Sequence, residues 1–148
     1  MIKITPNHNN KTVLVELHRS ADGIRRGIRR GLFDIGRAHV RNARKSITAG
    51  AKTGRVYNIR GTKHQASAPG ESPANLSGTL QKSINYTVRG SSEMEFGDKV
   101  FYGRFLEDGT TKMKPRQHLG RTVEELRAYT RRTLNRCIDQ EIKRRATR

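Results

Sequence analysis

The first hydrophobic pattern in the chain is a short alternation of apolar and polar residues near its start. Residues 2–5 read Ile-Lys-Ile-Thr, and a looser alternation follows over residues 12–17. Residues 6–10 lie between them, read Pro-Asn-His-Asn-Asn and are rich in turn formers. Alternation on both sides of a turn is typical of a hairpin, so we predict a β-hairpin over residues 2–17.

The next pattern has helical spacing and is the longest in the chain. Ser20 is a suitable N-cap, and apolar residues then recur three or four positions apart, or at multiples of these spacings. These apolar residues are Ile24, Ile28, Leu32, Ile35, Ala43 and Ile47. They predict one buried face of a helix over residues 21–48.

Four glycines interrupt this predicted helix, at positions 23, 27, 31 and 36. Each glycine inside a helix costs about 1 kcal/mol relative to alanine. We therefore expect a second backbone to approach closely at these positions, or else a kink or a later helix start.

Arginines occupy the opposite face of the predicted helix. They are Arg26, Arg30, Arg37, Arg41 and Arg44. Such a row fits a solvated charged face, and it fits equally a surface that docks on acidic protein or phosphate. Phe33 and Val40 lie near the same face, where solvent does not favour them, and this favours a protein contact.

Residues 49–78 change character and are rich in small residues, glycine and proline. We predict a long extended loop there, broken by a short strand over residues 55–60. A loop of this length inside a compact domain is uncommon unless it has a function. It either becomes ordered against a neighbouring subunit or forms a disordered arm.

Shorter elements are predicted after the loop. Residues 75–82 fit a short helix, and alternation over residues 84–88 fits a strand. A hairpin is predicted around Gly97-Asp98, with strands over residues 93–96 and 99–102.

The final segment predicts a second long helix. Thr122-Val123-Glu124-Glu125 fits a capping box, and amphipathic spacing continues to residue 145. The chain then reads as a single domain with five parts in order: hairpin 2–17, helix 21–48, extended loop 49–78, strands 84–102 and helix 122–145. This order predicts an α+β fold, in which a small antiparallel β-sheet packs with a long N-terminal helix and a C-terminal helix, with a long central loop.

Charge adds an expectation about partners. The formal net charge of +18 argues for an anionic partner, such as nucleic acid or an acidic protein surface. Only 32% of the residues are hydrophobic, a lean composition that favours oligomerisation as a source of stability. With one cysteine, Cys137, and no apolar run of signal-peptide or bilayer length, we expect synthesis in a cytoplasm and no membrane contact.

Candidate chemistry is sparse in this sequence. The five histidines do not pair with one another, or with Cys137, at zinc-ligand spacing. The chain has no Walker-type phosphate-binding loop and no nucleophile elbow. His39 lies near the apolar helix face and is best explained as a core histidine. We therefore predict a protein that is not an enzyme and uses no catalytic residue, metal, cofactor or small-molecule substrate.

Two segments together resemble one known family. Residues 66–74 read Ala-Ser-Ala-Pro-Gly-Glu-Ser-Pro-Ala and are followed by Leu-Ser-Gly-Thr-Leu at residues 76–80 and Ser-Ile at residues 83–84. Residues 102–116 read Tyr-Gly-Arg-Phe-Leu-Glu-Asp-Gly-Thr-Thr-Lys-Met-Lys-Pro-Arg. In order and separation these segments are similar to motifs of the tail-completion, or neck, proteins of long-tailed bacteriophages, a family also described as minor tail proteins.

The resemblance extends over residues 20–145. Its motif positions in this chain are Pro69, Gly70, Gly78, Leu80, Tyr102, Glu107, Gly109, Thr110, Lys112, Met113 and Arg116. Asp108 replaces an aromatic residue of the family pattern, Gln117-His118 stands where Pro-Phe is expected, and Gly120 replaces a bulkier residue. These departures leave open how the chain packs after Arg116. Gly109 is expected to adopt a positive φ and to turn the chain sharply.

The resemblance implies a virion structural protein of a tailed phage or prophage, without enzymatic activity. Such a protein completes or caps the tail at the head–tail junction and joins it to the head connector, as a hexameric ring around the DNA channel. Its implied partners are copies of itself and other connector and tail proteins, with packaged DNA close by. From the residues alone, the alternative is a small basic nucleic-acid-binding protein.

Predicted contact residues lie on the arginine-bearing helix and in the central loop. They are Arg26, Arg30, Phe33, Arg37, Val40, Arg41, Arg44, Arg55, Tyr57, Arg60, Lys63, Pro69 and Glu71. We expect most of the arginines to meet acidic protein surfaces, because a strongly cationic channel would retain DNA.

Overall fold

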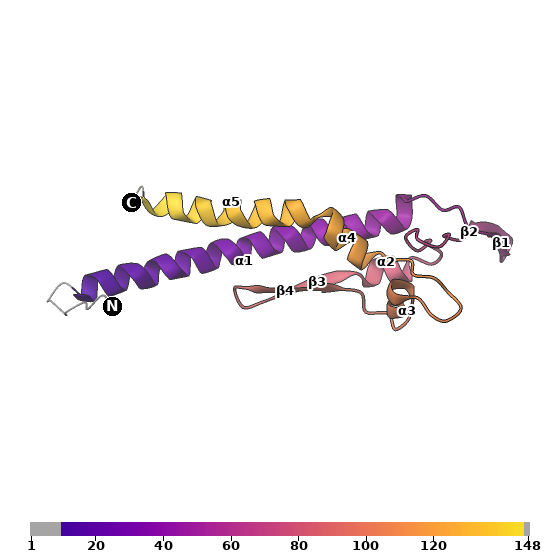
Figure 1. Ribbon diagram of the computed structural model, residues 1–148, viewed down its shortest axis with the longest axis horizontal. Helices are drawn as coiled ribbons and strands as arrows, with labels where there is room; N and C mark the ends of the chain where they lie inside the picture. Colours follow the sequence, from indigo (N-terminus) through magenta and orange to yellow (C-terminus); the bar gives the residue numbers. More distant parts are fainter. Residues whose placement is uncertain (1–9, 147–148) are drawn as a thin grey trace.

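The computed structural model describes residues 10–146. Two long helices, α1 (Asn10–Ala49) and α5 (Arg127–Ala146), run antiparallel side by side along an elongated molecule (Figure 1). A β-hairpin packs along α1, and a second hairpin extends beyond the far end of the helices (Figure 1). The combination of helices with small antiparallel sheets confirms the α+β class.

The first helix begins earlier than the sequence pattern predicts. Because α1 starts at Asn10, the strand predicted over residues 12–17 is wrong, and the rest of the predicted hairpin, residues 2–9, lies outside the described residues. Positions 13, 17, 21, 24 and 28 also fit helical spacing. Extending an existing helix requires no new nucleation, so these residues continue the helix instead of forming a strand.

The strands form two separate pairs. Strands β1 (Val56–Ile59) and β2 (Thr62–Gln65) pair antiparallel within the segment predicted to be an extended loop. The predicted strand over residues 55–60 corresponds to β1, while β2 was not predicted. The central segment is therefore partly ordered by its own hairpin.

The second pair is β3 (Asn85–Arg89) with β4 (Glu93–Gly97), in a register that places Tyr86 opposite Phe96. The hairpin predicted around Gly97-Asp98 is wrong, because β4 turns back on β3 at Gly90, whose φ of 59° suits a tight turn. Residues 99–102 do not form a strand.

Three short helices connect these parts. Helix α2 (Thr79–Ser83) overlaps the predicted region 75–82 but begins four residues later and ends one residue beyond it. Helix α3 (Gly103–Asp108) was not predicted. The predicted C-terminal helix is divided into α4 (Leu119–Glu125) and α5, which meet at Leu126. The proposed capping box is wrong, because Thr122 lies inside α4 and its hydroxyl donates to the His118 carbonyl.

The glycines of α1 permit close packing, as the sequence predicted. A Cβ on Gly27 would lie 2.8 Å from the Cys137 carbonyl oxygen of α5, and one on Gly31 would lie 3.1 Å from a Leu134 methyl group. A Cβ on Gly36 would collide with the ring of Tyr86 on β3. The small residues thus let both α5 and the β3–β4 hairpin approach the α1 backbone.

The hydrophobic core is small and lies towards the C-terminal half of α1. Its buried centre consists of Ala43, Ile47, Leu80 and Ile84. Half-buried side chains from β4, the following loop and α3 surround this centre, namely Phe96, Val100, Tyr102 and Leu106, with Val40 of α1. His39 is buried beside Phe96 and its Nδ1 lies 2.9 Å from the Ile35 carbonyl oxygen, as a core histidine.

Candidate functional site

The two segments that carry the family resemblance lie against each other. The Gly70 amide donates to the Pro115 carbonyl at 3.2 Å, and Arg121 donates to the Gly70 carbonyl. The Ser72 hydroxyl also donates to the Gln117 carbonyl at 3.5 Å. We call the unit formed by residues 67–73 and 107–121 the motif junction.

Glu71 holds one side of the motif junction to the segment after α1. Its carboxylate accepts hydrogen bonds from the Thr53 hydroxyl at 2.6 Å, the Ala68 amide at 2.8 Å and the Thr53 amide at 3.0 Å. These bonds, the Thr53 hydroxyl first, lower the pKa of Glu71 to about 2. Glu71 was predicted as a contact residue, and the structure gives it an intramolecular role.

Glu107 holds the other side of the motif junction. It accepts the Gly120 amide at 2.6 Å, the His118 amide at 3.0 Å and the Leu119 amide at 3.1 Å. These donors belong to the first turn of α4, where a carboxylate satisfies amides that have no partner inside the helix. Burial opposes ionisation of Glu107, but the hydrogen bonds outweigh it and lower its pKa to about 2.

His118 lies fully buried between two carboxylates. Its Nε2 is 3.0 Å from Asp98 Oδ2, and its Nδ1 is 3.1 Å from Glu107 Oε2, although the latter contact is outside hydrogen-bond geometry. Burial disfavours the charged ring, but the two carboxylates prevail and raise the pKa of His118. The arrangement joins the chain before α3 to the start of α4, and it explains how the segment after Arg116 packs.

Sequence reasoning identified Glu107 as a motif residue but treated His118 only as a departure from the family pattern. Asp98 was assigned to a turn. The three residues are separated by 9 and 11 positions along the chain, with no regular spacing. A buried histidine of this kind leaves no local pattern, because its partners come from different elements.

The remaining motif positions form the turn itself. Gly109 has a φ of 78°, as predicted, and the Thr110 amide donates to the Met113 carbonyl at 2.7 Å. The Arg116 amide donates to Leu106 O at 2.7 Å, which closes the loop after α3. Gly70 and Gly78 also have positive φ, while Leu80 and Tyr102 belong to the core, and Lys112 is exposed. Most of the motif therefore builds the fold.

The arginines predicted as a docking face of α1 do not share one role. Arg30 pairs with the buried Glu141 of α5 at 2.5 Å, and Arg44 donates to the Ile84 carbonyl at 2.9 Å. Arg37 pairs with Asp34 of the same helix. Arg26 and Arg41 are exposed. The predicted face is thus divided between tertiary contacts and exposed positions.

The two apolar residues predicted on this face also meet the protein itself. Phe33 packs edge-on to Tyr86, with ring centroids 6.3 Å apart, and Arg29 lies over its ring. Val40 packs against the core. Their presence among the arginines is explained by the β3–β4 hairpin, whose position against α1 is not evident from the sequence pattern.

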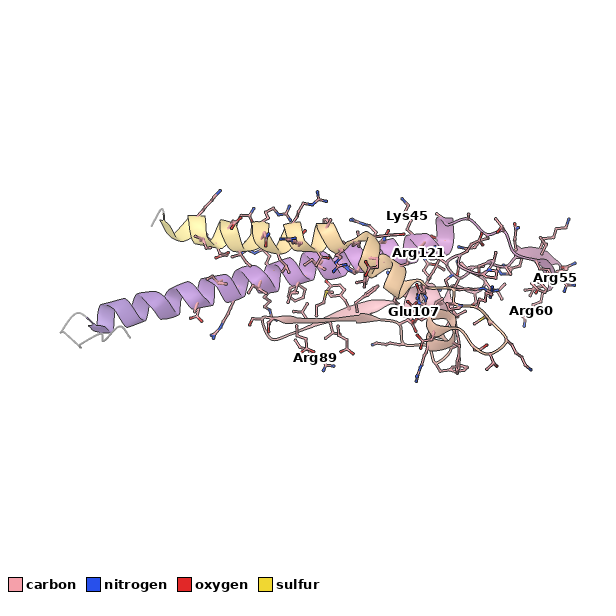
Figure 2. The ribbon with its side chains drawn as sticks, viewed as in Figure 1. Lys45, Arg55, Arg60, Arg89, Glu107 and Arg121 are labelled. Carbon is pink, nitrogen blue, oxygen red and sulfur yellow. The ribbon has the colours of Figure 1, made fainter. Side chains whose placement is uncertain are left out.

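The arm, residues 55–66, carries four of the other predicted contact residues. Arg55, Tyr57, Arg60 and Lys63 are all exposed, and the Arg55 guanidinium lies 5.5 Å from the Tyr57 ring centroid. Pro69 is exposed at the edge of the motif junction. Arg55 and Arg60 lie at the outer end of the molecule (Figure 2). The arm therefore presents the predicted contact residues together on one projection.

No known protein family, curated protein or solved structure matches this chain. Over residues 10–146, no group of three or more His, Cys, Asp and Glu side chains is arranged to hold a metal ion. No helix in the part of the chain that the structure describes is long and apolar enough to cross a membrane.

Proposed function

We propose that this chain is a structural component of a tailed-phage virion, located at the head–tail junction. It completes the tail and joins it to the head connector as a hexameric ring of identical subunits around the DNA channel. The proposal starts from the family resemblance of residues 66–84 and 102–116, and it is supported by the shape and surface of the molecule.

The observation that carries the proposal is the large surface of an isolated subunit. The chain exposes 11193 Å², whereas a compact monomer of 16.8 kDa exposes about 7,700 Å². A subunit with so much surface and so small a core fits a protein that is completed by its neighbours.

Exposed apolar side chains indicate where a neighbouring subunit makes contact. Phe101 is 86% exposed and Phe105, four residues later on α3, is 49% exposed. Leu76, in the loop before α2, is 61% exposed. Large exposed aromatic residues are typical of subunit contacts, where they are buried on assembly.

The close association of the two motif segments gives further support. The hydrogen bonds between residues 67–73 and 107–121 make them one structural unit, so their joint occurrence in the sequence has a physical reason. This unit directly follows the arm in the chain, and the Arg116 amide joins it to α3 through the Leu106 carbonyl. The family pattern is thus connected with the part of the surface that we assign to assembly.

The test combines mass measurement with assembly. The purified protein is expected to form a ring that is visible by electron microscopy, and to convert isolated heads and tails into joined particles. Phe101→Ser with Phe105→Ser should shift the mass from ring to monomer in light scattering, whereas Val123→Ser on α4 should not. A wild-type protein that stays monomeric at high concentration and joins neither heads nor tails would refute the proposal.

A further inference from the structure

The acidic residues of this chain are distributed very unevenly. Residues 35–70 contain no Asp or Glu, and residues 109–123 contain none either. The first stretch includes eight basic residues: Arg37, Arg41, Arg44, Lys45, Lys52, Arg55, Arg60 and Lys63. The second includes Lys112, Lys114, Arg116 and Arg121. Because the Gly70 amide bonds to Pro115, the two stretches meet at one end of the molecule (Figure 1).

Positive charges are crowded at this end. Lys114 and Arg121 line a surface hollow of about 460 Å³ beside Pro69 and Gly70. Burial lowers the pKa of Lys52, and the nearby charge of Arg121 lowers it further, although Glu71 opposes this effect. Anionic groups bound at this surface would relieve the repulsion between the cations.

The arm has the form of a two-stranded ribbon, one face of which carries three polar residues and one exposed valine. The register pairs Val56 with Gln65 and Asn58 with Lys63, and all four side chains are exposed. The alternate face carries Ile59 and His64, which are half-buried, and Tyr57 and Thr62, which are exposed. The strands end at Arg60 and Gly61, which turn with φ values of 51° and 82°. One face of the ribbon is therefore free along its whole length.

We propose that the arm binds duplex DNA by inserting into its major groove, while the surrounding basic residues contact the phosphates. A four-residue strand is about 13 Å long, and the major groove is about 12 Å wide and admits a two-stranded ribbon. Asn58, Lys63 and Gln65 are residue types that hydrogen-bond to base edges in this groove. Arg55 and Arg60 flank them, in position for the backbone.

An acidic protein fits this surface less well than DNA does. Residues 35–70 and 109–123 contain no carboxylate, and Glu71, which lies beside them, accepts three hydrogen bonds from Thr53 and Ala68. A phosphate backbone presents negative charge continuously along its length, which matches cations that extend over both stretches. In this proposal the DNA is held at the outer end of the subunit, so no cationic channel lining is required.

The first experiment measures binding of the full chain to a 20-base-pair duplex by fluorescence anisotropy at several salt concentrations. Arg55→Gln, Arg60→Gln and Lys63→Gln together should weaken binding at least tenfold and reduce the salt slope by about 2–3. The matched control replaces Arg25, Arg89 and Arg127 by Gln, which removes the same charge from arginines already paired with carboxylates. Equal weakening by the two triple variants would overturn the proposal.

Competition experiments identify the class of partner that the arm binds and the DNA groove that it enters. Polyglutamate at equal charge should displace the duplex poorly, and displacement as effective as by unlabelled duplex would overturn the proposal in favour of an acidic protein. The major-groove ligand methyl green should compete with the protein, and netropsin in the minor groove should not. The reverse pattern would refute insertion into the major groove.

Measuring particle mass together with DNA affinity distinguishes failure of this inference from failure of the proposed function. A triple variant that still forms rings but loses DNA binding supports both proposals. A wild-type protein that stays monomeric, yet binds the duplex through the arm, supports only the inference about DNA. Rings whose DNA affinity is unchanged by the triple substitution would overturn the inference alone.

Discussion

At the scale of single residues, Glu107 and His118 connect parts of the chain that the backbone alone leaves separate. Glu107 accepts three amides at the start of α4 and faces the buried imidazole of His118. On the opposite side of the ring, Asp98 completes the contact. A charge buried in this way stabilises the fold only while its partners are present.

This cluster predicts how stability depends on pH. The folded-state pKa of Glu107 is about 2, below its ordinary value of 4.5, so its contribution is present above pH 4.5 and is lost as pH falls towards 2. The pKa of His118 is raised above 6.5, so its contribution is complete below pH 6.5 and is lost as pH rises through the folded-state value. Urea unfolding across the pH range should therefore give maximum stability between pH 4.5 and pH 6.5, where both contributions are complete.

Replacing one carboxylate tests this assignment directly. Glu107→Gln should lower the free energy of unfolding by about 3 kcal/mol near pH 5.5 and should flatten the loss of stability below pH 4.5. Glu125→Gln, which affects an exposed side chain bonded to Asn42, serves as the control and should cost under about 1 kcal/mol. An acid limb as steep in Glu107→Gln as in the parent protein would contradict the role given to Glu107.

At the scale of elements, the packing of α1 against α5 depends on the absence of side chains at particular positions. Gly27 faces the Cys137 carbonyl, which is backbone and cannot move alone, whereas Gly31 faces the flexible end of Leu134. Arg30 and Glu141 add a partly buried ion pair between the same helices. Gly27 and Gly31 of α1 are therefore expected to tolerate a side chain to different degrees.

This difference predicts that alanine lowers stability at Gly27 but not at Gly31. Gly27→Ala gains about 1 kcal/mol of helix propensity but incurs about 1–3 kcal/mol of overpacking, so we expect a net loss of about 1 kcal/mol. Gly31→Ala should be neutral or stabilising, because Leu134 can adjust. Thermal unfolding of both variants provides the measurement, and a Gly27→Ala protein as stable as Gly31→Ala would rule out the close backbone approach.

At the scale of the whole molecule, the core and the arm are spatially separate. The core lies between α1, the β3–β4 hairpin and α3, while the arm extends beyond the motif junction (Figure 1). The Gly54 amide donates to the Ala66 carbonyl at 3.0 Å, so the two ends of the arm are already adjacent. The arm is thus attached to the fold at a closed base.

Removal of the arm should leave the fold intact. Replacing residues 55–65 by two glycines is expected to lower the free energy of unfolding by less than about 1 kcal/mol, or roughly 4 °C in the melting temperature. Replacing residues 86–96 in the same way should be far more damaging, because it removes Tyr86 and Phe96 from their contacts with α1 and the core. Comparable melting temperatures for the two deletions would show that the arm contributes to the core.

The sequence by itself determined the features that depend on local spacing and conformation. Leu32, Ile35, Ala43 and Ile47 are buried as the periodicity predicts, whereas Ile24 of the same predicted face is exposed. The α+β class follows from the order of elements, and Gly109 turns the chain with positive φ. It also determined the excess of positive charge and its segregation from acidic residues, since these are properties of composition.

Only the tertiary structure decided which residues meet. It paired β3 with β4 and gave Arg30, Arg44 and Phe33 internal partners. It also placed His118 between Asp98 and Glu107. The physical reason is that burial and ion pairing depend on distances between residues far apart in the chain. Local periodicity restricts each element, but the partner of a side chain is chosen when the elements pack.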